Sequence, residues 1–130
     1  MQNTTLSLAQ VDKQELDDPF EYAMASRDAD VFHLVHDALA AGRGQLAFQP
    51  VVTSDAQHQI AFYEGLIRLS DESGRVLPAA HFMPQVEDTD LGRQIDCLSL
   101  ELALRKLRQN PDLRLSVNLS ARSIGDGEWR

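Results

Sequence analysis

Cysteine, basic residues and long apolar runs are all scarce in this chain of 130 residues. Cys97 is the single cysteine, so no disulfide can form within the chain, and a reducing compartment fits best. Lysine and arginine number 12 against 20 aspartates and glutamates, which gives a net charge of −8. A negative chain repels phosphate backbones, so we expect no DNA binding. A small phosphodiester held through a metal ion is still compatible, because the metal reverses the local charge.

No segment approaches the roughly 20 consecutive apolar residues of a membrane span. Residues 1–10 have neither a basic start nor an apolar run, so no secretory signal is visible. We therefore expect no membrane segment and a cytoplasmic location. The content of 43% hydrophobic and 25% charged residues is typical of one modest globular domain.

Acidic residues are concentrated near the N-terminus. Residues 1–30 hold seven acids and two bases, and the stretch to about Pro19 shows no apolar periodicity. We therefore expect residues 1–26 to form an acidic, mobile leader and residues 27–130 to form the folded domain.

Helical spacing of apolar residues predicts three helices, over about residues 27–41, 78–86 and 89–109. Asp88 or Thr89 is expected to cap the last of them. The apolar residues of this long helix form two neighbouring stripes and so predict a wide buried face: Leu91, Ile95, Leu98 and Leu102 in one, and Leu100, Leu104 and Leu107 in the other.

Strand-like alternation predicts three strands, over residues 45–52, 59–69 and 113–120. Pro50 is expected to end the first strand or to place a bulge in it. The order helix, strand, strand, helix, strand indicates an α/β fold with at least one βαβ crossover. An open parallel sheet and a partial barrel both fit this order.

Polar side chains follow one face of the second and third predicted strands. Alternation puts Glu64 and Arg68 on the same face, opposite a wholly apolar face, and Asn118 lies near the end of the third strand. Since ligands gather at the C-terminal ends of strands in parallel α/β folds, we expect these three residues to share a cleft. Carboxylate and amide oxygens suit Mg²⁺, Mn²⁺ or Ca²⁺, and arginine suits phosphate. Without further knowledge, the residues fit better as solvated or paired side chains of a strand, Glu64 and Arg68, and a turn-forming asparagine, Asn118.

Four short motifs occur in order along the chain: F-Q-P-V at residues 48–51, Y-E-G-L-I-R at 63–68, F-M-P at 82–84 and S-V-N-L-S-A at 116–121. They resemble the successive motifs of the EAL domain family, whose pattern is roughly F-Q-P-I, E-A-L-L-R, F-I-P-x-A-E and V-N-L-S. Four motifs with family-like spacing are far more specific than any one alone. The resemblance covers about residues 31–129.

This resemblance implies a modified TIM barrel that hydrolyses cyclic-di-GMP to linear pGpG with two divalent ions, Mg²⁺ or Mn²⁺. It implies that Glu64 is the catalytic carboxylate and, with Asn118, a metal ligand. It also implies substrate contacts from Gln49, Leu66 and Arg68. The expected partners are cyclic-di-GMP and, through self-association of the EAL domain, a second copy.

Two departures from the family pattern matter. Gly65 stands where the signature has alanine. A TIM barrel needs ~200–250 residues, so we expect a partial TIM-like (β/α) barrel, the N-terminal half of an EAL domain, inactive alone because it lacks the later catalytic residues. Three functions stay open. They are phosphodiesterase activity in the complete domain, a degenerate EAL module that binds cyclic-di-GMP or a protein partner without catalysis, and association of half-domains.

Overall fold

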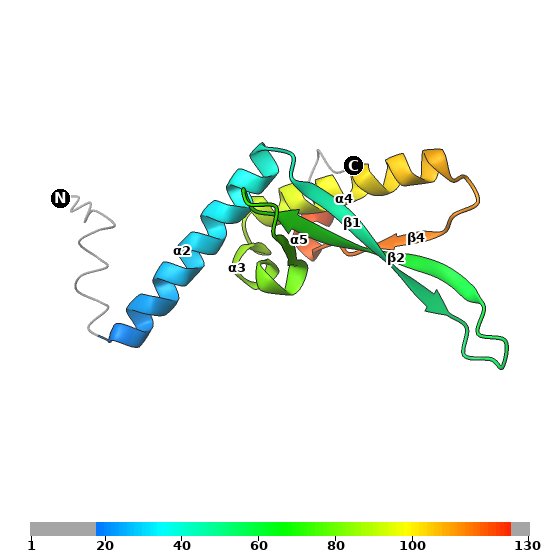
Figure 1. Ribbon diagram of the computed structural model, residues 1–130, viewed down its shortest axis with the longest axis horizontal. Coiled ribbons are helices and arrows are strands. Elements are labelled where there is room, and N and C mark those ends of the chain that lie inside the picture. The colour runs from blue at the N-terminus through cyan, green and yellow to red at the C-terminus, as the bar shows by residue number, and fades with distance from the viewer. Residues whose placement is uncertain (1–17, 126–130) are drawn as a thin grey trace.

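The computed structural model describes residues 18–125. Its elements follow in the order α2 (Pro19–Ala40), β1 (Gly44–Val52), β2 (Ile60–Ser70), β3 (Val76–Pro78), the 3-10 turn η1 (Ala79–His81), α3 (Met83–Val86), α4 (Asp90–Gln109), β4 (Leu115–Val117) and α5 (Ala121–Ile124). Figure 1 shows the sheet at the centre, α4 along it and α2 projecting away from the body. Within the described residues, no helix combines the length and apolarity that a membrane crossing requires.

Helix α2 begins at a well-defined cap. The Asp18 carboxylate accepts a hydrogen bond of 2.9 Å from the backbone N–H of Phe20, and Pro19 occupies the first turn. The predicted start near Arg27 is therefore wrong by eight residues, because the first turns bury no apolar stripe and only the cap marks them. The predicted leader, 1–26, reaches into this helix, and its residues 1–17 lie outside the described residues. The domain boundary at residue 27 stays a prediction.

The four strands form one mixed sheet around β2. Strand β1 pairs with β2 antiparallel along one edge, while β3 pairs antiparallel and β4 parallel along the other. The parallel β2–β4 pair, with α4 in its connection, confirms the predicted βαβ crossover. An all-parallel open sheet is wrong for β1, because the few residues between β1 and β2 can make only a hairpin.

The observed elements between residues 44 and 117 differ from the sequence prediction in three places. Strand β1 continues through Pro50, and its register shift falls one residue later, between Val51 and Val52. The edge position of β1 in the described sheet explains this, since proline has no N–H to donate to a second neighbour. The third predicted strand shortens to β4. The helix predicted over 78–86 becomes the end of β3, the turn η1 and the short helix α3.

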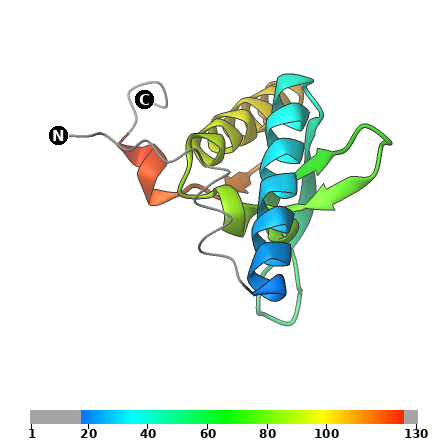
Figure 2. The same ribbon diagram turned by 90° about the vertical axis from the view of Figure 1, so that its left-hand side faces the viewer.

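One face of the sheet is covered by helices α2, α3 and α4. Figure 2 shows α2 in front, with α4 and α5 to one side of it and the β2–β3 turn to the other. Gly65, Ile67 and Leu69 on the predicted apolar face of β2 are buried beneath them, whereas Tyr63 is half-buried and Ala61 is exposed. The core consists of side chains from β2 and the three helices: Val35, Ala38, Ile67, Leu69, Phe82, Val86, Leu91 and Ile95. The opposite face of β2 carries the polar residues.

Helix α4 has the predicted wide buried face, but on a different side. The stripe that contains Leu91 and Ile95 is buried or half-buried as predicted, whereas Leu104 in the second stripe is 51% exposed. The second buried stripe consists instead of small and polar residues at helical spacing: Gly92, Asp96, Ser99 and Ala103. A residue without a side chain is needed at Gly92, because an added Cβ would lie 2.6 Å from the Val86 carbonyl oxygen.

Candidate functional site

Glu64 and Asn118 meet across the parallel strands. Glu64 lies in the middle of β2, and Asn118 is the first residue after β4. The strand register aligns Glu64 with Ser116 and so places Asn118 two residues further along the same face. The Nδ2 group of Asn118 donates a hydrogen bond of 3.1 Å to Oε1 of Glu64. The sequence therefore predicted the meeting of these two side chains correctly.

Gln49 joins the pair from the opposite edge of β2. The antiparallel register sets Gln49 directly across from Glu64, and directly opposed residues project to the same side of a sheet. Leu66 and Arg68 follow on this face, with Arg68 about 13 Å along the strand from Glu64 at 3.3 Å per residue. The structure thus groups Gln49, Glu64 and Asn118 and sets Arg68 at one end of the same face.

A shared cleft for Glu64, Arg68 and Asn118 was also predicted. The cavity next to the site, of about 110 Å³, lies between β2, α3 and α4 on the helix-covered side of the sheet. Asn118 and Leu66 line it, whereas Glu64 and Arg68 do not. The three predicted residues therefore share a sheet face without sharing this cavity.

Glu64 and Asn118 carry the donor types that a hard divalent cation takes, a carboxylate and an amide oxygen, and in this structure the amide presents its Nδ2 group to Glu64. Glu64 is half-buried and Asn118 is exposed, so water can reach both groups. Among residues 18–125, no cluster of three or more acidic, histidine or cysteine side chains is placed to hold a metal. Mg²⁺ keeps several waters and takes one or two carboxylates, so two protein donors supply a partial ligand set.

Asp96 on α4 lies next to this site, and the sequence analysis did not single it out. Its Oδ2 atom accepts three hydrogen bonds: 3.0 Å from the backbone N–H of Ser120, 2.9 Å from Oγ of Ser120 and 2.6 Å from Oγ of Ser123. These contacts tie α4 to the connection between β4 and α5, two residues beyond Asn118. The helical spacing of Gly92, Asp96 and Ser99 shows in the sequence that the three share one helix face, but it does not show that this face is buried.

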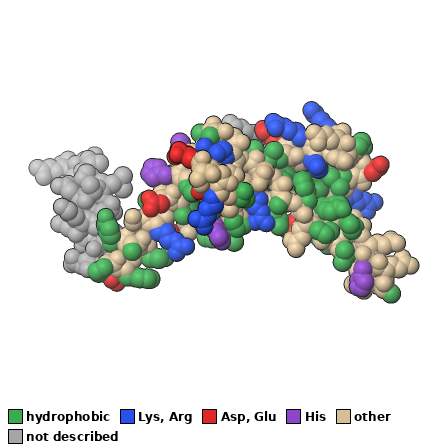
Figure 3. Space-filling view, viewed as in Figure 1, with side chains coloured by type: hydrophobic (Ala, Val, Ile, Leu, Met, Phe, Trp, Pro, Cys, Tyr) green, Lys and Arg blue, Asp and Glu red, His purple; other side chains and the backbone are tan. Residues whose placement is uncertain are grey.

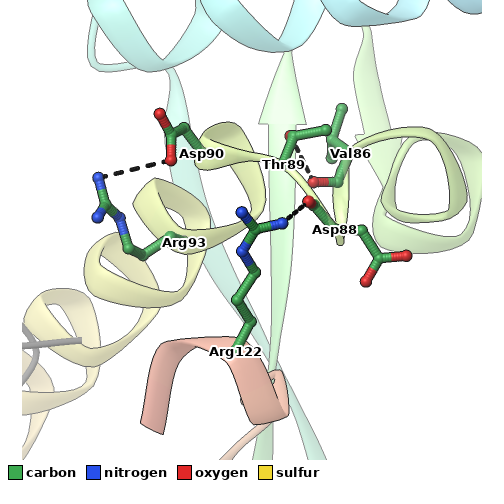
Figure 4. A network of polar contacts seen from close by, with 6 residues as sticks. All are labelled: Val86, Asp88, Thr89, Asp90, Arg93 and Arg122. Carbon is green, nitrogen blue, oxygen red and sulfur yellow. Dashed lines mark hydrogen bonds and ion pairs between the residues drawn. The ribbon is translucent and has the colours of Figure 1, made fainter. Parts of the chain in front are cut away.

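Helix α5 is tied down a second time at the start of α4. Figure 4 shows the Arg122 guanidinium donating to the backbone carbonyl of Asp88. Of the two predicted caps of α4, Asp88 and Thr89, it is Thr89 that occupies the N-cap position. Its hydroxyl donates to the carbonyl of Val86 at 2.6 Å instead of capping the helix. Helix α5, which follows the end of β4 that carries Asn118, is thus held against the connection between α3 and α4.

Gly65→Ala is expected to be tolerated and to raise the free energy of unfolding by up to ~1 kcal/mol, because glycine weakens a strand interior. An added Cβ would lie 3.4 Å from Leu46 Cδ1 and from the Ser116 carbonyl oxygen, and 3.5 Å from Val117 Cγ1, which is ordinary contact. Urea denaturation measures the change. A loss of more than ~2 kcal/mol would show that this backbone cannot accept the methyl group.

The fold and site together define part of a TIM-like α/β barrel domain with a carboxylate–amide pair where parallel strands meet. The family model described as "EAL domain" matches residues 34–129. This chain therefore belongs to the EAL domain family, and the four motifs noted above all lie within the matched range.

Solved structures agree with this assignment. The FimX EAL domain from Pseudomonas aeruginosa bound to c-di-GMP is 28% identical, with a TM-score of 0.63 over 76% of this chain and 40% of that chain. The Xanthomonas citri FimX EAL domain in complex with c-di-GMP is 25% identical, with a TM-score of 0.65 over 82% and 42%. Vibrio cholerae LapD (S helix-GGDEF-EAL, apo) is similar in fold alone, at 17% identity and a TM-score of 0.64 over 78% and 25%.

Two further facts complete the comparison. No curated protein shows a significant match to this chain. The chain spans about two fifths of the FimX EAL domain structures, so only part of the barrel is present.

Proposed function

We propose that this chain is the N-terminal part of an EAL-type phosphodiesterase that hydrolyses cyclic-di-GMP to linear pGpG with Mg²⁺ or Mn²⁺. The contact between Glu64 and Asn118, each inside a family motif, is the observation that carries the proposal. The c-di-GMP bound to both FimX relatives supports the ligand class. A cytoplasmic location belongs to the proposal and is supported by the single cysteine of the chain.

Each site residue has a chemical role in this proposal. Glu64 and Asn118 hold the cation through their oxygen atoms, and Glu64 thereby acts at the reacting centre. A divalent ion bound there neutralises phosphate charge and lowers the pKa of a bound water. In the reaction the oxygen of a water would form a bond to one phosphorus, one P–O ester bond of the ring would break, and the proton that the water loses would end on the leaving ribose oxygen.

The remaining residues bind and orient the dinucleotide. Arg68 offers a planar set of N–H donors to phosphate oxygens, and such charge-assisted hydrogen bonds also fix orientation. The Gln49 amide, directly across from Glu64, can both donate and accept a hydrogen bond. Leu66 supplies an apolar surface between Glu64 and Arg68 for a base. Because c-di-GMP carries two phosphates, a site extended along β2 suits its length.

Binding without hydrolysis is the second proposed function. Gly65 in place of the signature alanine and the c-di-GMP held in both FimX structures favour it. The complete domain that contains this segment distinguishes the two: it is incubated with cyclic-di-GMP and Mn²⁺, and pGpG is followed by chromatography while calorimetry measures binding. Formation of pGpG supports the phosphodiesterase. Binding without product supports the second function, and neither product nor binding contradicts both.

The 130-residue chain alone is expected to produce no pGpG, because its described residues offer only two of the metal ligands at this site. Self-association or partial folding is also expected. Figure 3 shows hydrophobic side chains gathered over the β1–β2 hairpin and the neighbouring part of α4. Large hydrophobic residues of these three elements are exposed: Val52, Ile60, Phe62 and Leu104. Light scattering measures the mass against 14.5 kDa for one chain. A compact monomer that forms pGpG would contradict both expectations.

A further inference from the structure

Asp96 is a buried carboxylate on α4, whereas acidic residues on helices are usually exposed to water. It is 4% exposed, and Ser123, which donates to it, is fully buried. All three of its donors are neutral groups, two hydroxyls and one backbone N–H, and all converge on the single oxygen Oδ2. Burying a carboxylate is costly unless it is well hydrogen-bonded, and an apolar residue would pack at this position without that cost. The contacts of Asp96 therefore indicate a role beyond filling space.

The segment that Asp96 holds is the one that carries Asn118. The ladder between β2 and β4 fixes the backbone up to Val117. Asp96 fixes it again at Ser120, through both the backbone N–H and the hydroxyl. Only Asn118 and Leu119 lie between these two attachments, so the position of Asn118 relative to Glu64 depends on both.

We propose that Asp96 is a positioning residue that holds Asn118 at the distance from Glu64 at which the two can share a cation. The inference rests on the proposed metal-binding role of the Glu64–Asn118 pair. Asp96 contacts neither the cation nor the substrate in this role. Loss of its carboxylate releases Ser120, and the connection that carries Asn118 then has several positions of similar free energy.

The test uses the complete domain and three variants. Asp96→Asn keeps the shape but removes the charge that strengthens all three hydrogen bonds, and Asp96→Ala removes them. Ser99→Ala is the matched control, because Ser99 is equally buried on the same helix and donates only to the carbonyl of Ile95, at 2.9 Å. Calorimetry with Mn²⁺ and no substrate measures metal affinity. Circular dichroism and urea denaturation report folding.

We expect both Asp96 variants to bind Mn²⁺ about 10- to 100-fold more weakly, as is typical when a residue that orients a metal ligand is lost. Ser99→Ala should bind Mn²⁺ as the wild type does. A merely structural role would lower the urea midpoint of the Asp96 variants but leave the Mn²⁺ affinity of the folded protein unchanged, and that result overturns the proposal.

Two further measurements keep the test decisive. If Asp96→Ala does not fold, Ser123→Ala removes a single hydrogen bond to the same oxygen and should weaken Mn²⁺ binding severalfold; wild-type affinity in that variant overturns the proposal. If the wild-type domain binds no Mn²⁺, the proposed function fails, and hydrogen exchange then tests whether Asp96 holds the segment that carries Asn118. The backbone amides of Asn118 and Ser120 should exchange at least about tenfold faster in Asp96→Asn than in Ser99→Ala, and equal rates overturn the positioning role.

Discussion

Glu64→Ala in the complete domain is expected to lower the rate of cyclic-di-GMP hydrolysis by about 10³-fold or more. The substitution removes the carboxylate that accepts the hydrogen bond from Asn118 and, in the proposed function, empties a position in the metal ligand set. Several kcal/mol of stabilisation of the transition state are lost with it, and each 1.4 kcal/mol is a factor of ten in rate. The rate of pGpG formation at saturating Mn²⁺ measures the effect.

Two companion variants separate ligation from folding. Glu64→Gln keeps the size of the side chain and loses its charge, so it should show a similar loss of rate with a nearly unchanged urea midpoint. Glu101→Ala removes an exposed glutamate on α4, distant in sequence from every motif, and should leave the rate unchanged. Wild-type turnover by Glu64→Ala would mean that the carboxylate is not a metal ligand.

Gly92→Ala is expected to lower the free energy of unfolding by about 3 kcal/mol or more. Gly92 lies in the first turn of α4, and an added Cβ would lie 2.6 Å from the Val86 carbonyl oxygen and 2.7 Å from that of Glu87. Both atoms belong to the backbone at the end of α3, so no flexible side chain can move away, and overpacking of this kind is strongly destabilising.

Urea denaturation with Gly125→Ala as the matched control measures this effect. A Cβ at Gly125 would find its nearest atom, the Arg122 carbonyl oxygen, at 3.9 Å, so this variant should change the stability little. A loss below ~1 kcal/mol for Gly92→Ala would show that α3 and α4 can separate without cost. Because Asp96 lies one turn further along the helix, a displaced α4 should also weaken Mn²⁺ binding.

The elements with clear hydrophobic periodicity were predictable from the sequence. The long helix was predicted to end near Gln109, as α4 does, and alternation correctly assigned Gly65, Ile67 and Leu69 to the buried face of β2. The first turns of α2 were not predictable from hydrophobic periodicity, because their residues are exposed and only Asp18 and Pro19 mark the start of the helix. The antiparallel direction of β1 was not predictable either, because alternation identifies the two faces of a strand but not its orientation relative to its neighbours.

The candidate site was predictable in its motif residues but not in what supports them. Glu64 and Asn118 lie in motifs and at matching strand phase, so their meeting could be anticipated although they are 54 positions apart in the sequence. Asp96 could not be anticipated in the same way, because an acid on an amphipathic helix is usually solvated. Its burial depends on α5 and Ser123, whose placement follows from the tertiary structure alone.

The antiparallel entry of β1 has a mechanical consequence. Because β1 starts where β2 ends, the C-terminus of α2 arrives at the strand end that lies beyond Arg68. Two hydrogen bonds of 2.9 Å join Arg43 and Ser70 there, one from the Ser70 N–H to the Arg43 carbonyl and one from Arg43 Nε to the Ser70 carbonyl. The C-terminal end of α2 is therefore joined to β2 two residues from Arg68, so a displacement of this helix would also displace the strand that carries the site residues.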